Sequence, residues 1–96
     1  MEKVSIVMPT YKRRVPMIER AIKSVLNQTY KNIELVIVDD SPKSFPYRQE
    51  VKEYIFSLKD SRINYIQNEE NLGGALARNV GIFASHGTYI SFLDDD

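Results

Sequence analysis

Short apolar runs alternate with helix-like stretches along this chain, and the run from residue 33 to residue 38 restricts the fold most. It is apolar at every position except Glu34. A strand with one face in water alternates apolar and polar residues, whereas a parallel strand covered on both faces is almost continuously apolar. We therefore expect this run to be a buried strand of a parallel sheet.

The flanking segments predict three more strands and three helices. Apolar residues three and four positions apart indicate the helices, and β-branched runs indicate the strands. Pro9 lacks a backbone donor and is expected to end the first strand, whereas Pro16 suits the first turn of the first helix. In chain order we expect a strand at 4–8, a helix across 16–26, a strand at 33–38, a helix across 51–58, a strand at 63–66, a helix across 76–84 and a strand at 88–93.

The order βαβαβαβ predicts an α/β fold. We expect a Rossmann-like, mostly parallel sheet with right-handed crossovers and helices on both faces. Ninety-six residues make one small domain with a thin core. The aromatic residues Tyr54, Phe83 and Phe92 are expected to belong to that core.

Composition narrows the classes of function. Thirteen basic and thirteen acidic side chains cancel, so we expect no bulk attraction to nucleic acid. The chain has no cysteine, which excludes disulfides, thiolate metal sites and a cysteine nucleophile. No apolar stretch approaches the roughly 20 residues of a membrane span, and no signal-peptide pattern precedes the first strand. A soluble, cytoplasmic protein is the expectation.

Three of the four expected strands end in residues that could bind a ligand. Tyr11 offers a flat ring, Asp40 could accept a hydrogen bond from a ring N–H, and the residues from Asp94 to Asp96 could hold a cation. In open α/β sheets, ligands bind outside the carboxyl ends of the strands, where strand order reverses. This edge of the sheet could therefore bind a base, a ribose and a diphosphate together.

The acidic triplet Asp94-Asp95-Asp96 has two interpretations. Three adjacent carboxylates repel one another, and a divalent cation among their oxygens would offset that repulsion. A solvated acidic tail is the simpler alternative, because runs of like charge are often exposed. Taken alone, the triplet leaves both open.

Five segments of the chain resemble glycosyltransferase family 2. Residues 4–11 read VSIVMPTY, residues 21–30 read AIKSVLNQTY, and residues 34–41 read ELVIVDDS. The later segments are Asn71-Leu72-Gly73 followed by Ala77-Arg78-Asn79 and Gly81, and then GTYISFLDDD at residues 87–96. They occur in the order and spacing of the family and cover nearly the whole chain.

The resemblance implies the N-terminal half of a GT-A fold, with the acceptor-binding half missing from residues 1–96. It also implies metal-dependent transfer of a sugar, with inversion, from a nucleoside diphosphate, usually UDP, to an acceptor hydroxyl. The parent protein would act on an acceptor sugar or a lipid-linked glycan and could associate with the cytoplasmic face of a membrane. This half alone is expected to be inactive.

The resemblance also assigns roles to matching positions. Pro9, Thr10 and Tyr11 would line the uridine pocket, and Asp40 would pair with the base. Arg78 would lie near the base or the diphosphate, and Asp95 near the ribose or the donor sugar. Asp94 and Asp96 would form the Asp-x-Asp pair that holds Mg²⁺ or Mn²⁺ on the diphosphate. The family places its general base beyond this motif, so no residue of this chain takes that role.

Two positions depart from the family pattern. Ser41-Pro42 stands where the family usually has a glycine and then a serine, so the loop after Asp40 is expected to be stiffer. Lys12 replaces a frequent asparagine after the tyrosine. Neither change challenges the resemblance.

Other functions compete with this one. The run from Leu35 to Ser41 also looks like the acidic first strand of a response-regulator receiver domain, although a complete βα unit precedes it here. A dinucleotide-binding domain is disfavoured because the first strand lacks a G-x-G-x-x-G turn. The chain could also be a non-catalytic remnant that binds a partner or self-associates through an exposed apolar face.

Overall fold

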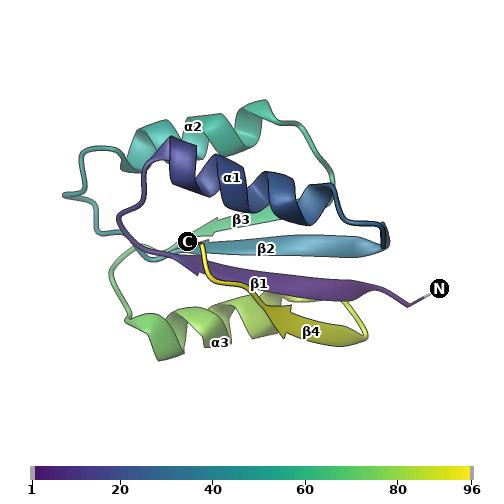
Figure 1. The fold of residues 1–96 in the computed structure, drawn as a ribbon. Coiled ribbons are helices and arrows are strands. Elements are labelled where there is room, and N and C mark those ends of the chain that lie inside the picture. Colours follow the sequence, from purple (N-terminus) through teal and green to yellow (C-terminus); the bar gives the residue numbers. More distant parts are fainter. Residues whose placement is uncertain (1, 96) are drawn as a thin grey trace.

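The computed structural model describes residues 2 to 95, which fold into a parallel sheet flanked by helices (Figure 1). The sheet has the order β3-β2-β1-β4, and all its strand pairs are parallel. This confirms the expected α/β class and element order. The elements are β1 (Val4–Thr10), α1 (Val15–Leu26), β2 (Ile33–Asp39), α2 (Arg48–Ser57), β3 (Ile63–Gln67), α3 (Gly74–Ala84) and β4 (Tyr89–Phe92).

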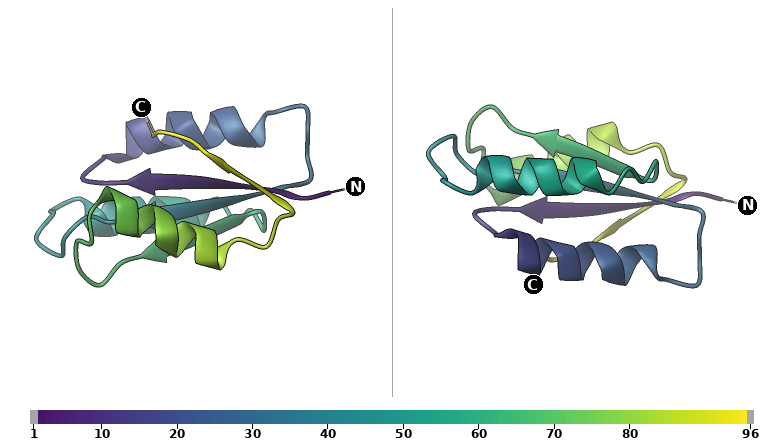
Figure 2. Two further views of the ribbon diagram at one scale, coloured as in Figure 1. Left: turned by 90° about the horizontal axis from the view of Figure 1, so that it is seen from below. Right: turned by 90° about the horizontal axis from the view of Figure 1, so that it is seen from above.

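Helices cover both faces of the sheet. Figures 1 and 2 show α1 and α2 on one face and α3 on the other. The larger core joins Ile6 and Leu35 of the central strands to Ile22 of α1 and Val51 of α2. The smaller core lies under α3, where Ala77 packs near Val7. Every residue of β2 is buried, which confirms that the run at 33–38 is a strand covered on both sides.

The first strand continues through Pro9 to Thr10, two residues beyond the expected end at Met8. Pro9 lies beside Val38 in the register of β1 and β2, and the Thr10 carbonyl accepts the Asp40 N–H at 2.9 Å. Only the donor of Pro9 is lost, because its carbonyl and the backbone of Thr10 can still pair. The carboxyl ends of β1 and β2 are therefore tied together.

The expectation that Phe83 and Phe92 belong to the core is wrong. Phe83 is 91% exposed and Phe92 is 50% exposed. The reason is that β4 is an edge strand, and α3 approaches the sheet through the small residues Ala77 and Gly81. Tyr54 is half-buried and packs against the larger core.

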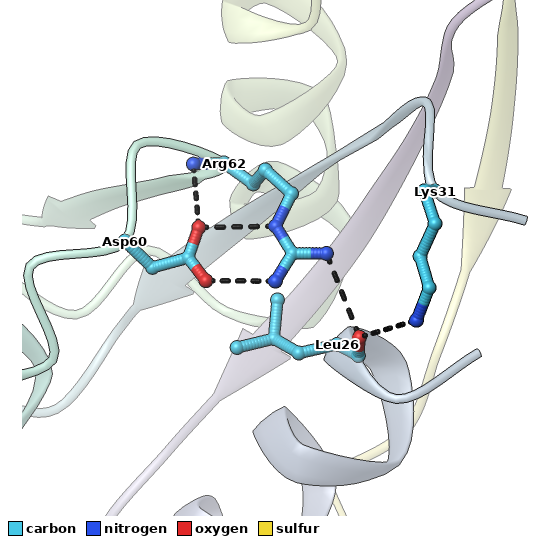
Figure 3. A network of polar contacts seen from close by, with 4 residues as sticks. All are labelled: Leu26, Lys31, Asp60 and Arg62. Carbon is cyan, nitrogen blue, oxygen red and sulfur yellow. Dashed lines mark hydrogen bonds and ion pairs between the residues drawn. The ribbon is translucent and has the colours of Figure 1, made fainter. Parts of the chain in front are cut away.

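A polar network joins the end of α1 to the loop before β3 (Figure 3). The Arg62 guanidinium makes two hydrogen bonds to Asp60, at 3.1 and 2.8 Å, which lower the pKa of that carboxyl. The backbone carbonyl of Leu26, the last residue of α1, accepts hydrogen bonds from Arg62 Nη1 at 3.5 Å and from Lys31 Nζ at 3.4 Å. Cations at this position satisfy a carbonyl that the helix leaves without a partner.

A second network joins β4 to β1 at the amino end of the sheet. The buried Glu34 carboxylate accepts the Ser5 hydroxyl at 2.7 Å and the His86 N–H at 2.5 Å. The Gly87 N–H donates to the Ser5 hydroxyl oxygen at 2.7 Å, and the Thr88 N–H donates to the backbone carbonyl of the residue just before β1 at 2.8 Å. These hydrogen bonds fix the start of β4 against the start of β1. They therefore also determine where the carboxyl end of β4 lies at the opposite edge of the sheet.

The residue after the C-terminal cap of α2 adopts a left-handed conformation, with φ of +50° at Lys59. Glycine adopts this conformation without strain, whereas other residues pay a steric penalty. Lys59→Gly should raise the free energy of unfolding by about 0.5 to 1 kcal/mol, measured by urea denaturation. The same change at Lys52, inside α2, should lower it by about 1 kcal/mol. A loss of stability at Lys59 would contradict the steric argument.

Candidate functional site

A pocket of about 460 Å³ lies at the carboxyl edge of the sheet. Its position is the switch point of the fold, because the chain passes from β1 to β2 on one side and returns to β4 on the other. Its volume falls within the range of small-molecule sites. Five of the residues expected to bind the nucleotide line it, namely Pro9, Thr10, Tyr11, Asp40 and Asp95.

Asp40 is the most heavily hydrogen-bonded residue of the pocket. One carboxylate oxygen accepts Asn68 Nδ2 at 2.8 Å and the Leu72 N–H at 2.9 Å. The other accepts Asn71 Nδ2 at 2.7 Å and the Gly73 N–H at 2.9 Å. The segment before α3 therefore folds around the Asp40 carboxylate. Asp40 is only 4% exposed.

The neighbouring Asp39 holds the loop after β2 through hydrogen bonds beneath the pocket surface. Its carboxylate accepts the Tyr65 hydroxyl at 2.6 Å and the Ser41 N–H at 3.0 Å, and it does not line the pocket. Burial, followed by this contact with Asp39, raises the pKa of Tyr65 well above its ordinary value. Arg48 then bridges the Ser41 and Asn68 carbonyls, at 3.2 and 2.8 Å. The loops after β2 and β3 are therefore held together.

Thr10 and Asp95 meet across 85 positions of sequence. The Thr10 hydroxyl donates to Asp95 Oδ2 at 2.7 Å, and Arg13 Nε lies 3.4 Å from the same oxygen. Both Thr10 and Asp95 are buried. The contact brings the residues after β4 against the end of β1, so one acid of the triplet faces the pocket with a cation beside it.

Tyr11 lies at the mouth of the pocket and is 47% exposed. The Lys12 ammonium lies 5.3 Å from the centre of its ring, within the range of a cation–π contact. Lys12 has φ of +53°, and its N–H donates to the buried Ser41 hydroxyl at 2.7 Å. Asparagine tolerates a left-handed conformation better than lysine does. This accounts for the asparagine that the resemblance places at position 12.

The remaining predicted site residues lie elsewhere. Asp94 is exposed and borders a separate hollow beside α1, with Met17 and Arg20. Arg78 is exposed on α3, and a Cβ built on Gly74 would lie 3.7 Å from its Nη1, so it is close to the pocket without lining it. Asp96 lies outside the described residues. Within residues 2–95, no three His, Asp or Glu side chains are grouped as a metal site would need.

Sequence reasoning missed several residues of the pocket. Arg13 belongs to a basic loop that is easily taken for solvated surface. Asn71, Gly73 and Gly74 form a turn in the sequence, and nothing local shows that this turn reaches Asp40. The pocket residues not assigned from the sequence are Arg13, Asn71, Gly73 and Gly74.

The chain matches the family model described as glycosyl transferase family 2 over residues 5–96. A similar curated protein is the UDP-Glc:alpha-D-GlcNAc-diphosphoundecaprenol beta-1,3-glucosyltransferase WfaP of Escherichia coli. It is 42% identical over 96 residues, which are 100% of this chain and 36% of WfaP. This match favours the glycosyltransferase interpretation over the receiver and dinucleotide-binding alternatives.

Two solved structures share the fold. One is the mannosyltransferase PcManGT from Pyrobaculum calidifontis in complex with GDP-Man and Mn²⁺, with a TM-score of 0.79 and 26% identity. It is matched by 97% of this chain over 27% of its own length. The other is S. aureus TarS 1-349 in complex with UDP-GlcNAc, with a TM-score of 0.78 and 28% identity. It is matched by 98% of this chain over 26% of its own length.

The chain therefore spans about a third of the length of WfaP and about a quarter of each solved structure. Among residues 2–95, no helix is long and apolar enough to cross a bilayer. The parallel sheet agrees with the GT-A structures, and the family model covers almost every residue. This chain belongs to glycosyl transferase family 2.

Proposed function

We propose that residues 1–96 form the nucleotide-sugar-binding part of an inverting glycosyltransferase that uses a UDP-sugar. The observation that carries the proposal is the pocket at the switch point, where Pro9, Thr10, Tyr11, Asp40 and Asp95 come together from three separate segments. These are the positions at which the family resemblance implies nucleotide binding. The pocket is also large enough for part of a nucleotide.

The chemistry of the pocket suits the parts of such a donor. The half-exposed ring of Tyr11 offers a stacking surface for a base. The Asp95 carboxylate can accept hydroxyl hydrogen bonds from a ribose or a sugar. Arg13 lines the pocket, and Arg78 lies beside Gly74 at its edge, so both cations could interact with a diphosphate.

We include Mg²⁺ or Mn²⁺ as a proposed cofactor, with Asp94 and Asp96 as the proposed ligands. Carboxylates suit these hard cations, and the PcManGT structure contains Mn²⁺. The described residues do not by themselves assemble a metal site. Asp94 and Asp95 both border the hollow beside α1, and Asp95 also contacts Thr10.

The name of one relative supports a proposal for the acceptor. WfaP is named for transfer to a diphosphoundecaprenol-linked sugar, so we propose an acceptor hydroxyl on a sugar or a lipid-linked glycan. The protein would then take part in polysaccharide or glycoconjugate synthesis at the cytoplasmic face of a membrane. A general base is not assigned to any residue of this chain. The exposed apolar side chains of β4 could also support self-association.

A nucleotide titration tests the proposal. Adding UDP with Mg²⁺ should shift the amide NMR signals of residues around Tyr11, Asp40 and Asp95, whereas ADP should shift them much less. Tyr11→Ala should weaken UDP binding by about tenfold, because stacking on an aromatic side chain contributes about 1 to 3 kcal/mol per base. Tyr30→Ala, an exposed tyrosine at the opposite end of the sheet, is the matched control and should leave affinity unchanged. A protein indifferent to UDP would exclude UDP binding by these residues.

A further inference from the structure

We infer that Ser41 is a positioning residue for the nucleotide site: its hydroxyl holds the turn at Lys12 and thereby fixes the ring of Tyr11 at the mouth of the pocket. The inference rests on the proposed function, because it takes Tyr11 as the side chain on which the base stacks. Ser41 itself is buried and is not among the residues that line the pocket. It therefore acts on the nucleotide through Tyr11 and does not touch it.

The backbone around Tyr11 is tied to the end of β2 at two points. On one side, the Thr10 carbonyl accepts the backbone N–H of Asp40 at 2.9 Å. On the other side, the Lys12 N–H donates to the Ser41 hydroxyl oxygen at 2.7 Å. Tyr11 is the residue between these two ties. Losing the second tie would leave the backbone after Tyr11 freer to rotate.

Lys12 is the residue that needs the second tie. Its φ of +53° is left-handed, a conformation that carries a steric penalty for lysine. This penalty is of the same order as the net free energy of one hydrogen bond. The bond from Lys12 to Ser41 can therefore offset the strain. Without it, the backbone should relax toward negative φ, which would move Tyr11 relative to α1.

Ser41 is a firm anchor for this turn. Its backbone N–H donates to the Asp39 carboxylate at 3.0 Å, and its carbonyl accepts Arg48 Nε at 3.2 Å. The residue is 2% exposed and precedes Pro42, which disfavours a helical backbone at Ser41. Because both backbone groups of Ser41 are paired, its hydroxyl stays in place beneath the loop that follows β1.

The Tyr11 ring depends on the turn more than its neighbour Arg13 does. The ring is half-exposed, so packing alone holds it weakly. The cation–π contact from the Lys12 ammonium also requires the turn. Arg13, by contrast, has an ion pair of its own with Asp95. A ring that is already in place loses less conformational freedom when a base stacks on it, which favours binding.

The two positions at which the sequence departs from the family pattern meet in this hydrogen bond. Lys12 stands where asparagine is frequent, and Ser41 stands where glycine is usual. Asparagine tolerates the left-handed conformation, and glycine offers no side-chain acceptor. Lys12 and Ser41 therefore compensate for each other, and substitutions at the two positions should not have additive effects.

Ser41→Ala tests the inference with little change in volume. UDP binding should weaken about threefold to fivefold, less than in Tyr11→Ala, because the ring remains but is no longer held. The Lys12 amide should exchange hydrogen at least about threefold faster, and the ring resonances of Tyr11 should shift. Ser57→Ala is the matched control, since this serine hydroxyl donates to the Tyr54 carbonyl at the last residue of α2. It should leave all three measurements unchanged.

Two double substitutions separate positioning of the ring from other effects. In the Tyr11→Ala background, Ser41→Ala should have no further effect on UDP affinity. In the Lys12→Asn background, it should cost less than about twofold, because asparagine adopts the left-handed conformation without the tie. A direct effect of the hydroxyl on the nucleotide, or a general loss of stability, would give the same loss in all three backgrounds and would overturn the inference.

The measurements on the free protein keep the two proposals distinguishable. If the wild type binds no UDP, the proposed function fails, and the Lys12 exchange rate and the Tyr11 ring resonances decide the role of Ser41. Changes in both for Ser41→Ala, with none for Ser57→Ala, would support the positioning role. Unchanged exchange and unchanged ring resonances in Ser41→Ala would overturn it.

Discussion

Gly87→Ala is expected to destabilise the protein by about 2 to 3 kcal/mol. A Cβ on Gly87 would lie 2.6 Å from the backbone nitrogen of Ser5 and 2.8 Å from the Lys3 carbonyl oxygen. Rotating a side chain cannot relieve contacts with backbone atoms, so β4 would have to move away from β1. Because β4 leads to Asp95, nucleotide affinity should fall as well.

Urea denaturation of Gly87→Ala and Gly74→Ala would measure this effect. Gly74 is the matched control, since an added Cβ there meets only the Arg78 guanidinium at 3.7 Å and the residue lies in the first turn of α3. Gly74→Ala should leave stability unchanged or raise it by up to about 1 kcal/mol. Equal midpoints for the wild type and Gly87→Ala would show that β4 is not tightly joined to β1.

Glu34→Ala is expected to cost about 2 to 3 kcal/mol at neutral pH. The change leaves the Ser5 hydroxyl and the His86 N–H without the carboxylate that now accepts both. Glu34→Gln retains an oxygen acceptor and should cost less than half as much. If alanine and glutamine gave equal losses, the carboxylate hydrogen bonds would not be the cause.

The same residue should make stability depend on pH. Burial alone would raise the pKa of Glu34, but the hydrogen bonds from the His86 amide, the Ser5 hydroxyl and the His86 ring outweigh it and hold the pKa below the ordinary value of 4.5. Its stabilisation is therefore complete above about pH 4.5 and is lost as the pH falls through the lower folded-state pKa. Thermal unfolding from pH 7 to pH 3 should show a steeper fall for the wild type than for Glu34→Gln. Asp60, whose pKa is also lowered, contributes equally to both proteins.

Local patterns determined the order of the elements and the buried character of β2. Apolar spacing depends on neighbours along the chain, so seven elements could be predicted with small errors at their ends. The predicted strands also placed Tyr11, Asp40 and Asp95 at strand carboxyl ends. Because the carboxyl ends of parallel strands lie at one edge of a sheet, these residues were expected at the same edge. In the structure these residues line one pocket at that edge.

Only the tertiary structure decided how these residues are used. The donors to Asp40 are 28 to 33 positions away, and Thr10 meets Asp95 across 85 positions. No local pattern encodes such pairings, because they depend on how loops from different strands pack at the edge of the sheet. The exposure of Phe83 has the same origin: helical spacing marks an apolar face, whereas the close approach of α3 through Gly81 selects which part of that face is buried.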